Sequence, residues 1–339
     1  MSHPSIELRK PYLVFLGDED SAPFAKTAYG VRDWAPEACI AQTRLPGCTV
    51  DLQLPEMSPE QAAAAGARSL LLGVAPRGGR IPGSWEPVLH RAVSAGLDIV
   101  SGMHTSLNEI PGLSEAAKRS GVRLIDVRHS KQSFAVGTGR KRSGKRLLTV
   151  GTDCVMGKKY TALALAKAMR SRGVDADFRA TGQTGIMIAG SGIAIVAVVA
   201  DFISGAAESL SPDAAANHWD VIEGQGSLFH PSYAGVTLGL LHGSQPDVLI
   251  LCHDPTRPSL KGLPDYPILP LPVAAERYLQ AARDTNPAVR LAGVSLNTAK
   301  LDASERERVI GETEAMMQLP CFDPIKSALD AVVTRILGP

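Results

Sequence analysis

Residues 151–161 read GTDCVMGKKYT, and their types and spacing suit phosphate binding. An apolar run at 147–150 precedes them and a helical pattern at 162–172 follows, which predicts a strand-to-helix turn. At such a turn, backbone N–H groups and the positive end of the helix dipole converge on a site for an anion. Lys158 would add a mobile positive charge. The predicted phosphate-contacting residues are Gly151, Thr152, Asp153, Cys154, Val155, Met156, Gly157, Lys158 and Lys159.

The stretch departs from the common phosphate loop G-x-x-x-x-G-K-[ST] at two positions. Thr152 stands where the first glycine is expected, and Lys159 replaces the hydroxyl residue that holds magnesium. Thr161 lies two residues farther on, and two helical positions rotate a side chain by roughly 200°. We therefore expect phosphate binding without a metal and without nucleotide hydrolysis. A glycine turn that merely joins a strand to a helix is the alternative.

Length and composition indicate the number of domains and exclude several classes of partner. A chain of 339 residues suits two domains, and 35 Lys and Arg against 34 Asp and Glu give no field that would favour nucleic acid. Five cysteines without C-x-x-C spacing indicate reduced thiols and no zinc site. No apolar run approaches the roughly 20 residues that span a bilayer. We expect a cytoplasmic protein, free of the membrane, whose partner is a small molecule and which forms a homo-oligomer.

Strand and helix patterns alternate along the first part of the chain, which predicts a parallel sheet with helices on both faces. The expected strands are 12–16, 69–74, 97–100 and 122–127, and the expected helices are 61–65, 84–95 and 114–120. Ligand loops would lie at the carboxyl ends of the strands, at 73–79 and 102–105. His104 lies in the second of these loops, where a hydrogen-bonded structural role is the alternative to catalysis.

The second domain is predicted to start after a basic linker at 137–146, whose charges are either solvated or help to neutralise a polyphosphate. Strands are expected at 176–180, 218–222, 247–252 and 289–296, and an apolar run at 193–200 ends at Asp201. Helices are expected at 273–283, 303–317 and 324–337. The glycine-rich segment 181–192 reads as a loop, whose glycines either let the backbone approach a ligand or only give flexibility. The prolines of 264–272 exclude regular structure there. Glu223 and His253-Asp254 follow strands beside the phosphate loop, where each either faces a ligand or caps the next helix.

Several motifs together resemble the D-glutamate N-acetyltransferase family, long described as a domain of unknown function. These motifs are GTDCVMGKKYTALALAKAM, DFRATGQTGIMIAG, VADFISGAAE, WDVIEGQGSLFHP, LGLLHGSQPD and GLPDYP, and they extend over nearly the whole chain. The resemblance implies an α/β protein with a Rossmann-like N-terminal domain, placed at 1–138, and a P-loop NTPase-like C-terminal domain, placed at 139–339. It also implies acetyl transfer from acetyl-CoA to the amino group of D-glutamate, in D-amino acid catabolism.

Acetyl transfer would explain the altered loop. CoA carries a pyrophosphate and a 3′-phosphate that the protein must bind, but no phosphoryl group is transferred. Acetyl transfer requires a base and a proton relay, for which Glu223, His230 and Asp201 are the candidates, and it requires no metal. An arginine should pair with the substrate carboxylates, and the sequence does not decide among Arg179, Arg77 and Arg80. The candidate substrate-binding residues in the second domain are Arg179, Thr181, Gln183 and Thr184.

Two other functions remain open at this point. The pair GTD-x-x-x-GK and VEGAGG of the dethiobiotin synthetase-like branch, which this chain matches with GTDCVMGKK and VIEGQGS, would suit an ATP-dependent ligase or kinase. Lys159 speaks against that reading because magnesium would lose its hydroxyl ligand. A sensor that binds a nucleotide or CoA without turnover is the third possibility, since a binding loop does not prove catalysis.

Overall fold

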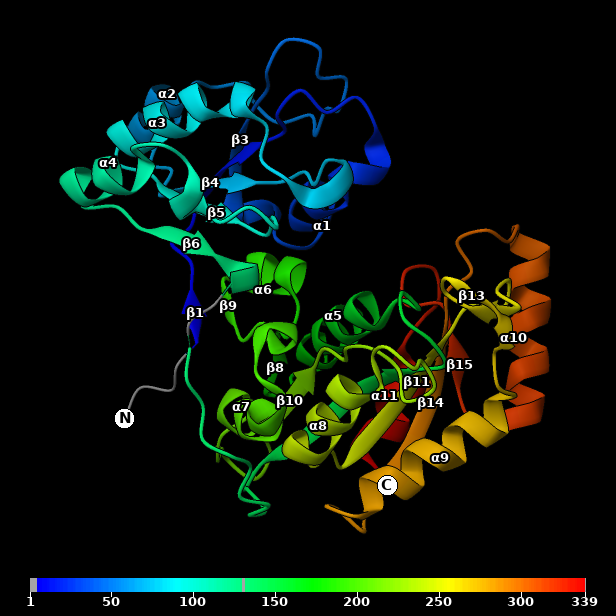
Figure 1. Cartoon of the computed structure of the whole chain (residues 1–339). Helices are drawn as coiled ribbons and strands as arrows, with labels where there is room; N and C mark the ends of the chain where they lie inside the picture. The colour runs from blue at the N-terminus through cyan, green and yellow to red at the C-terminus, as the bar shows by residue number, and fades with distance from the viewer. Residues whose placement is uncertain (1–4, 130–131, 339) are drawn as a thin grey trace. The chain divides into compact units, whose positions relative to one another are not determined.

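The structure is a computed structural model that describes residues 5–129 and 132–338 (Figure 1). Its contacts divide these residues into two compact units. One unit comprises residues 5–129 and 183–197, and the other comprises 132–182 and 198–338. The boundary expected between residues 138 and 139 assigned residues 183–197 to the second domain. In the structure these residues belong to the first unit. Each unit is described on its own.

The N-terminal unit contains a five-stranded parallel sheet in the order β3-β2-β4-β5-β6. Its strands are β2 (Tyr12–Phe15), β3 (Cys39–Thr43), β4 (Ser69–Leu72), β5 (Asp98–Ser101) and β6 (Leu124–Asp126). Its helices are α1 (Lys26–Trp34), α2 (Pro59–Ala64), α3 (Glu86–Ser94), α4 (Leu113–Ser120) and α6 (Gln183–Ala189). The sequence analysis did not predict α1 or β3. The strands and helices that it did predict for residues 5–129 are present, with ends that differ by a few residues. The alternation therefore predicted the sheet correctly.

Local chemistry explains two features of this unit. Ser58 and Gln61 form a capping box, in which the Ser58 side chain accepts from the Gln61 N–H and the Gln61 side chain accepts from the Ser58 N–H, so α2 starts at Pro59, two residues before the expected range. Gly17 ends the turn after β2 with φ +57°, and a Cβ there would lie 2.3 Å from the buried Trp85 ring. Only glycine fits between that turn and that ring.

The glycine-rich segment after β8 differs from the sequence prediction. Residues expected to form a loop instead form the helix α6, whose Ile186, Met187 and Ile188 are buried. The segment continues into β9 (Ser191–Gly192), which pairs with β1 (Ile6–Glu7). Burial of these three apolar side chains outweighs the low helix propensity of the glycines around them.

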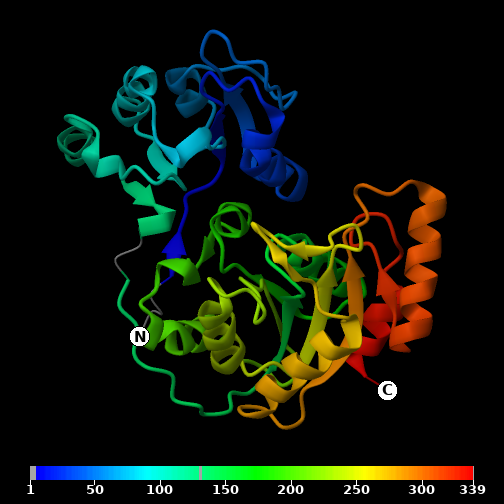
Figure 2. The ribbon, with the colours of Figure 1, turned by 45° about the vertical axis from the view of Figure 1, so that its right-hand side comes forward.

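The C-terminal unit contains a six-stranded parallel sheet in the order β15-β14-β11-β7-β10-β8 (Figure 2). Its strands are β7 (Lys145–Gly151), β8 (Ala176–Arg179), β10 (Trp219–Ile222), β11 (Val248–His253), β14 (Arg290–Leu296) and β15 (Cys321–Phe322). A separate hairpin pairs β12 (Ser259–Leu260) with β13 (Leu263–Pro267). The carboxyl ends of β7, β10 and β11 meet at one edge, because these strands are neighbours in parallel register.

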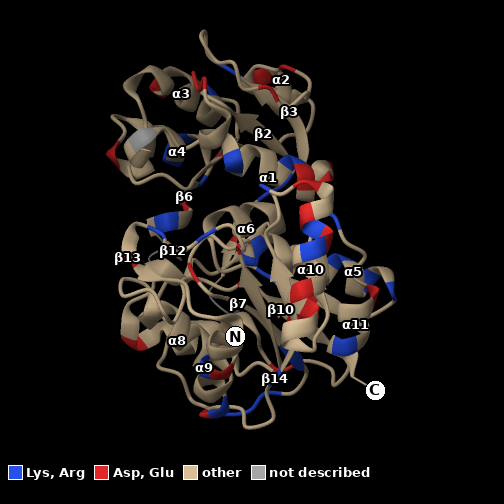
Figure 3. Cartoon of the chain, turned by 90° about the vertical axis from the view of Figure 1, so that its right-hand side faces the viewer, with Lys and Arg blue, Asp and Glu red and all other residues tan. Residues whose placement is uncertain are grey.

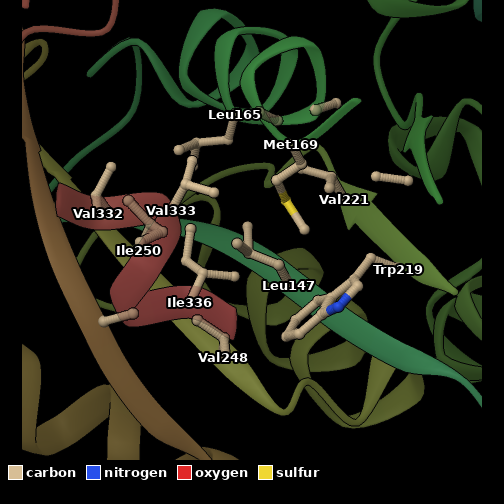
Figure 4. Packing of buried hydrophobic residues seen from close by; sticks show 14 of the residues in the cluster. Leu147, Leu165, Met169, Trp219, Val221, Val248, Ile250, Val332, Val333 and Ile336 are labelled. Atoms are coloured by element: carbon tan, nitrogen blue, oxygen red, sulfur yellow. The ribbon is translucent and has the colours of Figure 1, made fainter. Parts of the chain in front are cut away.

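Helices pack on both faces of this sheet. They are α5 (Lys158–Ser171), α7 (Ile203–Leu210), α8 (Ala234–Ser244), α9 (Leu271–Arg283), α10 (Ala303–Met317) and α11 (Asp330–Leu337). Leu165 and Met169 of α5 and Val333 and Ile336 of α11 pack on buried side chains of the central strands, as Figure 4 shows. This core fixes the start of α5 against the end of β7.

Two further predictions were wrong, and two helices of this unit were missed. The apolar run at 193–200 forms no sheet strand, and Asp201 lies exposed in a 3-10 turn (Ala200–Phe202). The proline-rich segment contains β13, whose prolines fall on a two-stranded hairpin that does not require every N–H. The helices α7 and α8 were not expected.

The basic run at 137–146 does not approach the phosphate loop. Arg142 and Arg146 are buried and donate to backbone carbonyl oxygens, among them those of Gly243 and Ser143. Arg140 pairs with Asp213. Since these residues precede or begin β7 and the loop follows its other end, the run holds the chain at the amino edge of the sheet. The hypothesis that it neutralises a polyphosphate in that loop was wrong.

Charges of both signs alternate along the outer helix α10 (Figure 3), in keeping with the near-zero net charge. Within residues 5–129 and 132–338, no helix combines the length and the hydropathy needed to cross a membrane.

Candidate active site

The turn between β7 and α5 presents a row of unpartnered backbone donors. Within the described part of the chain, nothing accepts a hydrogen bond from the backbone N–H groups of residues 153–157. Gly157, at φ +100°, is the N-cap of α5, a helix of 14 residues. Successive free N–H groups ahead of a helix N-terminus form a concave site for an anion. The predicted phosphate-binding loop therefore has the geometry that phosphate needs.

Lys158 places its charge inside this loop. The residue is only 7% exposed, and its Nζ donates to the carbonyl oxygen of Asp153 at 2.9 Å. Burial lowers the pKa of Lys158, with nearby Asp153 acting in the opposite direction. A phosphate would offer this ammonium group a stronger acceptor than a carbonyl oxygen and would offset part of its desolvation.

The loop lacks a hydroxyl that could hold magnesium next to Lys158. Thr161 turns away from the loop, because its Oγ1 lies 2.7 Å from Ser295 Oγ and 3.2 Å from the carbonyl oxygen of Gly157. This placement agrees with the rotation expected from helix geometry. The described residues also contain no cluster of three or more His, Cys, Asp or Glu side chains suited to a metal ion.

Asp153 and Arg257 brace the loop from the side of β11 and the β12–β13 hairpin. Asp153 Oδ2 accepts from Arg257 Nη1 at 3.0 Å and from the Lys261 N–H at 2.7 Å. Arg257 also donates to the carbonyl oxygens of Cys154 and Val155. Val155 has φ +58°, a costly conformation for a β-branched residue, so these contacts hold a strained turn in place.

The two loops that follow β7 and β10 are tied together at Gly151. Its carbonyl oxygen accepts from Tyr278 Oη at 2.8 Å and from Ser227 Oγ at 3.0 Å. Gly224 lies against β7, and a Cβ there would come within 1.6 Å of the Thr149 carbonyl oxygen. Gly224, the first glycine of the GQG turn, is therefore required for this close approach.

Glu223 lies at the carboxyl end of β10 and is 4% exposed. Its Oε2 accepts from the N–H groups of Thr181 and Gly182, each at 3.0 Å. Burial raises the pKa of Glu223, against the opposite effects of these hydrogen bonds and of Lys159. Glu223 thus lies at the predicted edge, where it holds the end of β8.

His230 is also buried near this edge, but both of its ring nitrogens are engaged. Nδ1 accepts from the Ser232 N–H at 3.2 Å, and Nε2 lies 3.2 Å from the carbonyl oxygen of Lys261. A nitrogen that accepts from an N–H has no free lone pair, and a nitrogen that faces a carbonyl carries the proton. His230 therefore joins the hairpin to the β10 loop and has no open base position.

His253 is the last residue of β11, and its ring touches the phosphate loop. Its Nδ1 lies 3.0 Å from Thr152 Oγ1, and its Nε2 makes no hydrogen bond with any residue that the structure describes. The side chain is partly exposed, and burial lowers the pKa of its imidazole. The sequence placed His253 at a strand end but did not single it out for catalysis.

The candidate substrate-binding residues do not form one group. Arg179 is ion-paired with Asp220 and Asp177. Thr181 Oγ1 donates to the carbonyl oxygen of Glu223 at 2.6 Å, which places Thr181 beside the β10 turn.

The remaining two candidates, Gln183 and Thr184, belong to the other compact unit. There Gln183 accepts from Arg128 and Thr184 Oγ1 lies 3.0 Å from Thr27 Oγ1. The ion pairs of Arg179 leave it poorly suited to binding a substrate carboxylate.

In the N-terminal unit, His104 is exposed and its carbonyl oxygen lies 2.9 Å from His129 Nε2. Its N–H donates to the carbonyl oxygen of Gly79 at 2.7 Å, so His104 joins the two loops that the sequence proposed as ligand loops. Arg80 is exposed, and the side chain of Arg77 lies outside the described part of the structure.

Comparisons with known proteins agree with this division of the chain. The family described as "Domain of unknown function (DUF1611_C) P-loop domain" matches residues 133–333. Its companion, "Domain of unknown function (DUF1611_N) Rossmann-like domain", matches residues 43–130. The chain belongs to the DUF1611 family.

Similar proteins match the chain over almost its full length. The chain is 45% identical over 331 residues to a D-glutamate N-acetyltransferase of Pseudoalteromonas sp, a match that covers 98% of this chain and 100% of the relative. It is 47% identical over 329 residues to a D-glutamate N-acetyltransferase of Tritonibacter scottomollicae, covering 97% and 99%. The crystal structure of a DUF1611 family protein from Anabaena variabilis has a TM-score of 0.83 and 32% identity, covering 98% and 100%.

These matches confirm the family resemblance and the expected combination of a Rossmann-like and a P-loop domain. Sequence reasoning found the DUF1611 phosphate loop and Glu223 but missed Arg257, Tyr278 and Ser227. Arg257 carried one available signal, since it follows the strand end His253-Asp254 by a few residues. Tyr278 carried none, because it lies within a helix and 127 positions from its partner Gly151.

Proposed function

We propose that this protein is a D-glutamate N-acetyltransferase that uses acetyl-CoA and binds the CoA phosphates in the loop at 151–158. The reaction is taken from the relatives in Pseudoalteromonas sp and Tritonibacter scottomollicae, which carry that name and match nearly the whole chain. The choice of acetyl donor rests on one observation in the structure, the row of free N–H groups at 153–157 beside Lys158.

CoA suits this loop better than a nucleotide that is to be hydrolysed. Its pyrophosphate and 3′-phosphate need donors and positive charge, which the N–H groups and Lys158 supply. Cleavage of ATP would also need a metal ligand next to the lysine, where this chain has Lys159 and where Thr161 bonds to Ser295.

In the proposed reaction, the neutral amino group of D-glutamate attacks the carbonyl carbon of the thioester. The N–C bond forms, the C–S bond breaks and CoA leaves as a thiolate, while one N–H proton passes to a base. The protein contributes the bound phosphates, the orientation of the thioester and the base.

The direct test is a thiol-release assay with the purified chain. Acetyl-CoA and D-glutamate are mixed without added metal, free thiol is followed, and N-acetylglutamate is detected by mass spectrometry. Thiol release that requires both substrates is expected. A second arm with D-glutamate, ATP and magnesium separates the alternative, because phosphate release there, with no thiol release in the first arm, would contradict acetyl transfer.

A further inference from the structure

We propose that His253 is the general base that accepts the amine proton through its Nε2. This inference rests on the proposed acetyl transfer and assigns a residue that the sequence left among the strand ends. His253 ends β11, next to β7 in the sheet, where Cys252 lies opposite Gly151 in register. Its ring therefore lies at the edge of the sheet from which the phosphate loop starts.

The hydrogen bond at Nδ1 fixes the orientation of the ring. Thr152 is fully buried, and its Oγ1 lies 3.0 Å from Nδ1. When Nδ1–H donates to Thr152 Oγ1, the lone pair of the neutral ring is on Nε2. No described residue hydrogen-bonds to that nitrogen, so a substrate proton can reach it.

Charged neighbours act on His253 with opposite signs. Burial lowers its pKa, Asp254 raises it, and Arg257 lowers it. Arg257 is itself paired with Asp153 at 3.0 Å. The net effect keeps the imidazole neutral at neutral pH, which is the form that a base requires.

The other three candidates are either engaged in holding the fold or placed away from this edge. His230 uses both ring nitrogens. Glu223 directs Oε2 at the two N–H groups of Thr181 and Gly182, so it holds the end of β8. Asp201 is exposed in a turn outside the sheet edge. His253 combines a fixed ring, a free nitrogen and contact with the phosphate loop.

The proton transfer is balanced without a further reagent. As the N–C bond forms, the amine nitrogen becomes positively charged and acidic, and one of its protons passes to Nε2 of His253. The tetrahedral intermediate then expels the thiolate, and the imidazolium ion returns its proton to the thiolate or to water. A base with a lowered pKa is adequate because the attacking nitrogen turns acidic during attack.

The test compares His253→Asn with the wild-type protein over the pH dependence of kcat. The wild type should lose kcat as pH falls through a pKa that lies below 6.5, the ordinary histidine value, because burial lowers the pKa of His253 and protonation removes the base. His253→Asn should lower kcat by about 10²–10⁴-fold and remove that limb, with the KM for acetyl-CoA nearly unchanged. Added imidazole should restore part of the rate. His242→Asn is the matched control, since His242 lies on α8 with Nε2 3.0 Å from the Ala281 carbonyl oxygen.

Several results would overturn this assignment. One is a wild-type kcat with no acid limb down to the lowest pH at which the protein stays folded, which needs no variant and so stands even if His253→Asn fails to fold. Another is a folded His253→Asn protein that keeps most of its kcat or retains the acid limb. Absence of acetyl transfer in the wild type would instead reject the proposed function, and the two failures are therefore distinguishable.

Discussion

The hydroxyl group of Tyr278 donates a hydrogen bond to the carbonyl oxygen of Gly151 at 2.8 Å, from the middle of α9 to the first residue of the phosphate loop. The hydroxyl oxygen of Tyr278 in turn accepts from the N–H of Leu228 at 3.1 Å. Burial raises the pKa of Tyr278 to about 12, so the hydroxyl keeps its proton at any physiological pH. One buried side chain thus holds two loops of the site at a fixed separation.

Tyr278→Phe should loosen both loops. The change leaves the partly buried Leu228 N–H without its acceptor, which costs up to about 3 kcal/mol. The free energy of unfolding should fall by that amount in urea titrations, and the KM for acetyl-CoA should rise several-fold. Tyr266→Phe is the control, because Tyr266 is 51% exposed on the β12–β13 hairpin. Equal effects of the two changes would show that the hydroxyl of Tyr278 has no special role.

Lys158→Ala should weaken the binding of acetyl-CoA. Loss of one charge-assisted contact costs about 1.5–3 kcal/mol, which corresponds to a KM increase of about tenfold or more. Initial-rate measurements over acetyl-CoA concentration check this expectation. Lys167→Ala is the matched control, since Lys167 is an exposed lysine of the same helix α5. An unchanged KM in Lys158→Ala would show that the CoA phosphates bind elsewhere.

Acetyl transfer should continue in the presence of EDTA. The position after Lys158 is Lys159, and the hydroxyl of Thr161 bonds to Ser295, so no hydroxyl next to Lys158 is available to magnesium. The rate of thiol release with and without EDTA provides the measurement. A rate that EDTA abolishes and magnesium restores would revive the ligase or kinase hypothesis.

The sequence predicted the parts of the fold in which local pattern and tertiary burial agree. The apolar run before Gly151 and the helical pattern after Lys158 identified β7 and α5, and α10 has the predicted limits, Ala303–Met317. It failed at α6, where three buried apolar residues override the glycines, and at Asp201, where an apolar run packs as a turn. In these segments tertiary contacts decide the backbone, and the sequence does not display those contacts.

The candidate site was predictable to a similar extent. The altered loop motif predicted the turn with its free N–H groups and the direction of Thr161, because both follow from helix geometry. Which base candidate has an open nitrogen depends on hydrogen bonds over long sequence separations, such as the 31 positions between His230 and Lys261. The sequence therefore named His230 as a base candidate and left His253 among the strand ends, whereas the contacts of the described residues leave a nitrogen open in His253 and none in His230.

His218 should make the stability of the C-terminal unit depend on pH. Its ring is 8% exposed, with Nδ1 3.0 Å from Asp175 Oδ2 and Nε2 3.3 Å from Asp220 Oδ1. Burial alone would lower the pKa of His218, but the hydrogen bonds and charges of the two carboxylates outweigh burial and raise it. The folded protein therefore binds this proton more tightly than the unfolded chain does.

The sign of the effect follows from linkage. A raised folded pKa contributes stability that is fully present below the unfolded value of 6.5 and is lost as pH rises through the folded pKa. His218→Gln should accordingly reduce the free energy of unfolding more at pH 6 than at pH 8, measured by urea denaturation at each pH. His90→Gln removes an imidazole whose Nε2 lies 3.0 Å from the Pro111 carbonyl oxygen and serves as the control. A stability loss in His218→Gln that is the same at both pH values would mean that the ring is neutral in the folded protein and acts by packing alone.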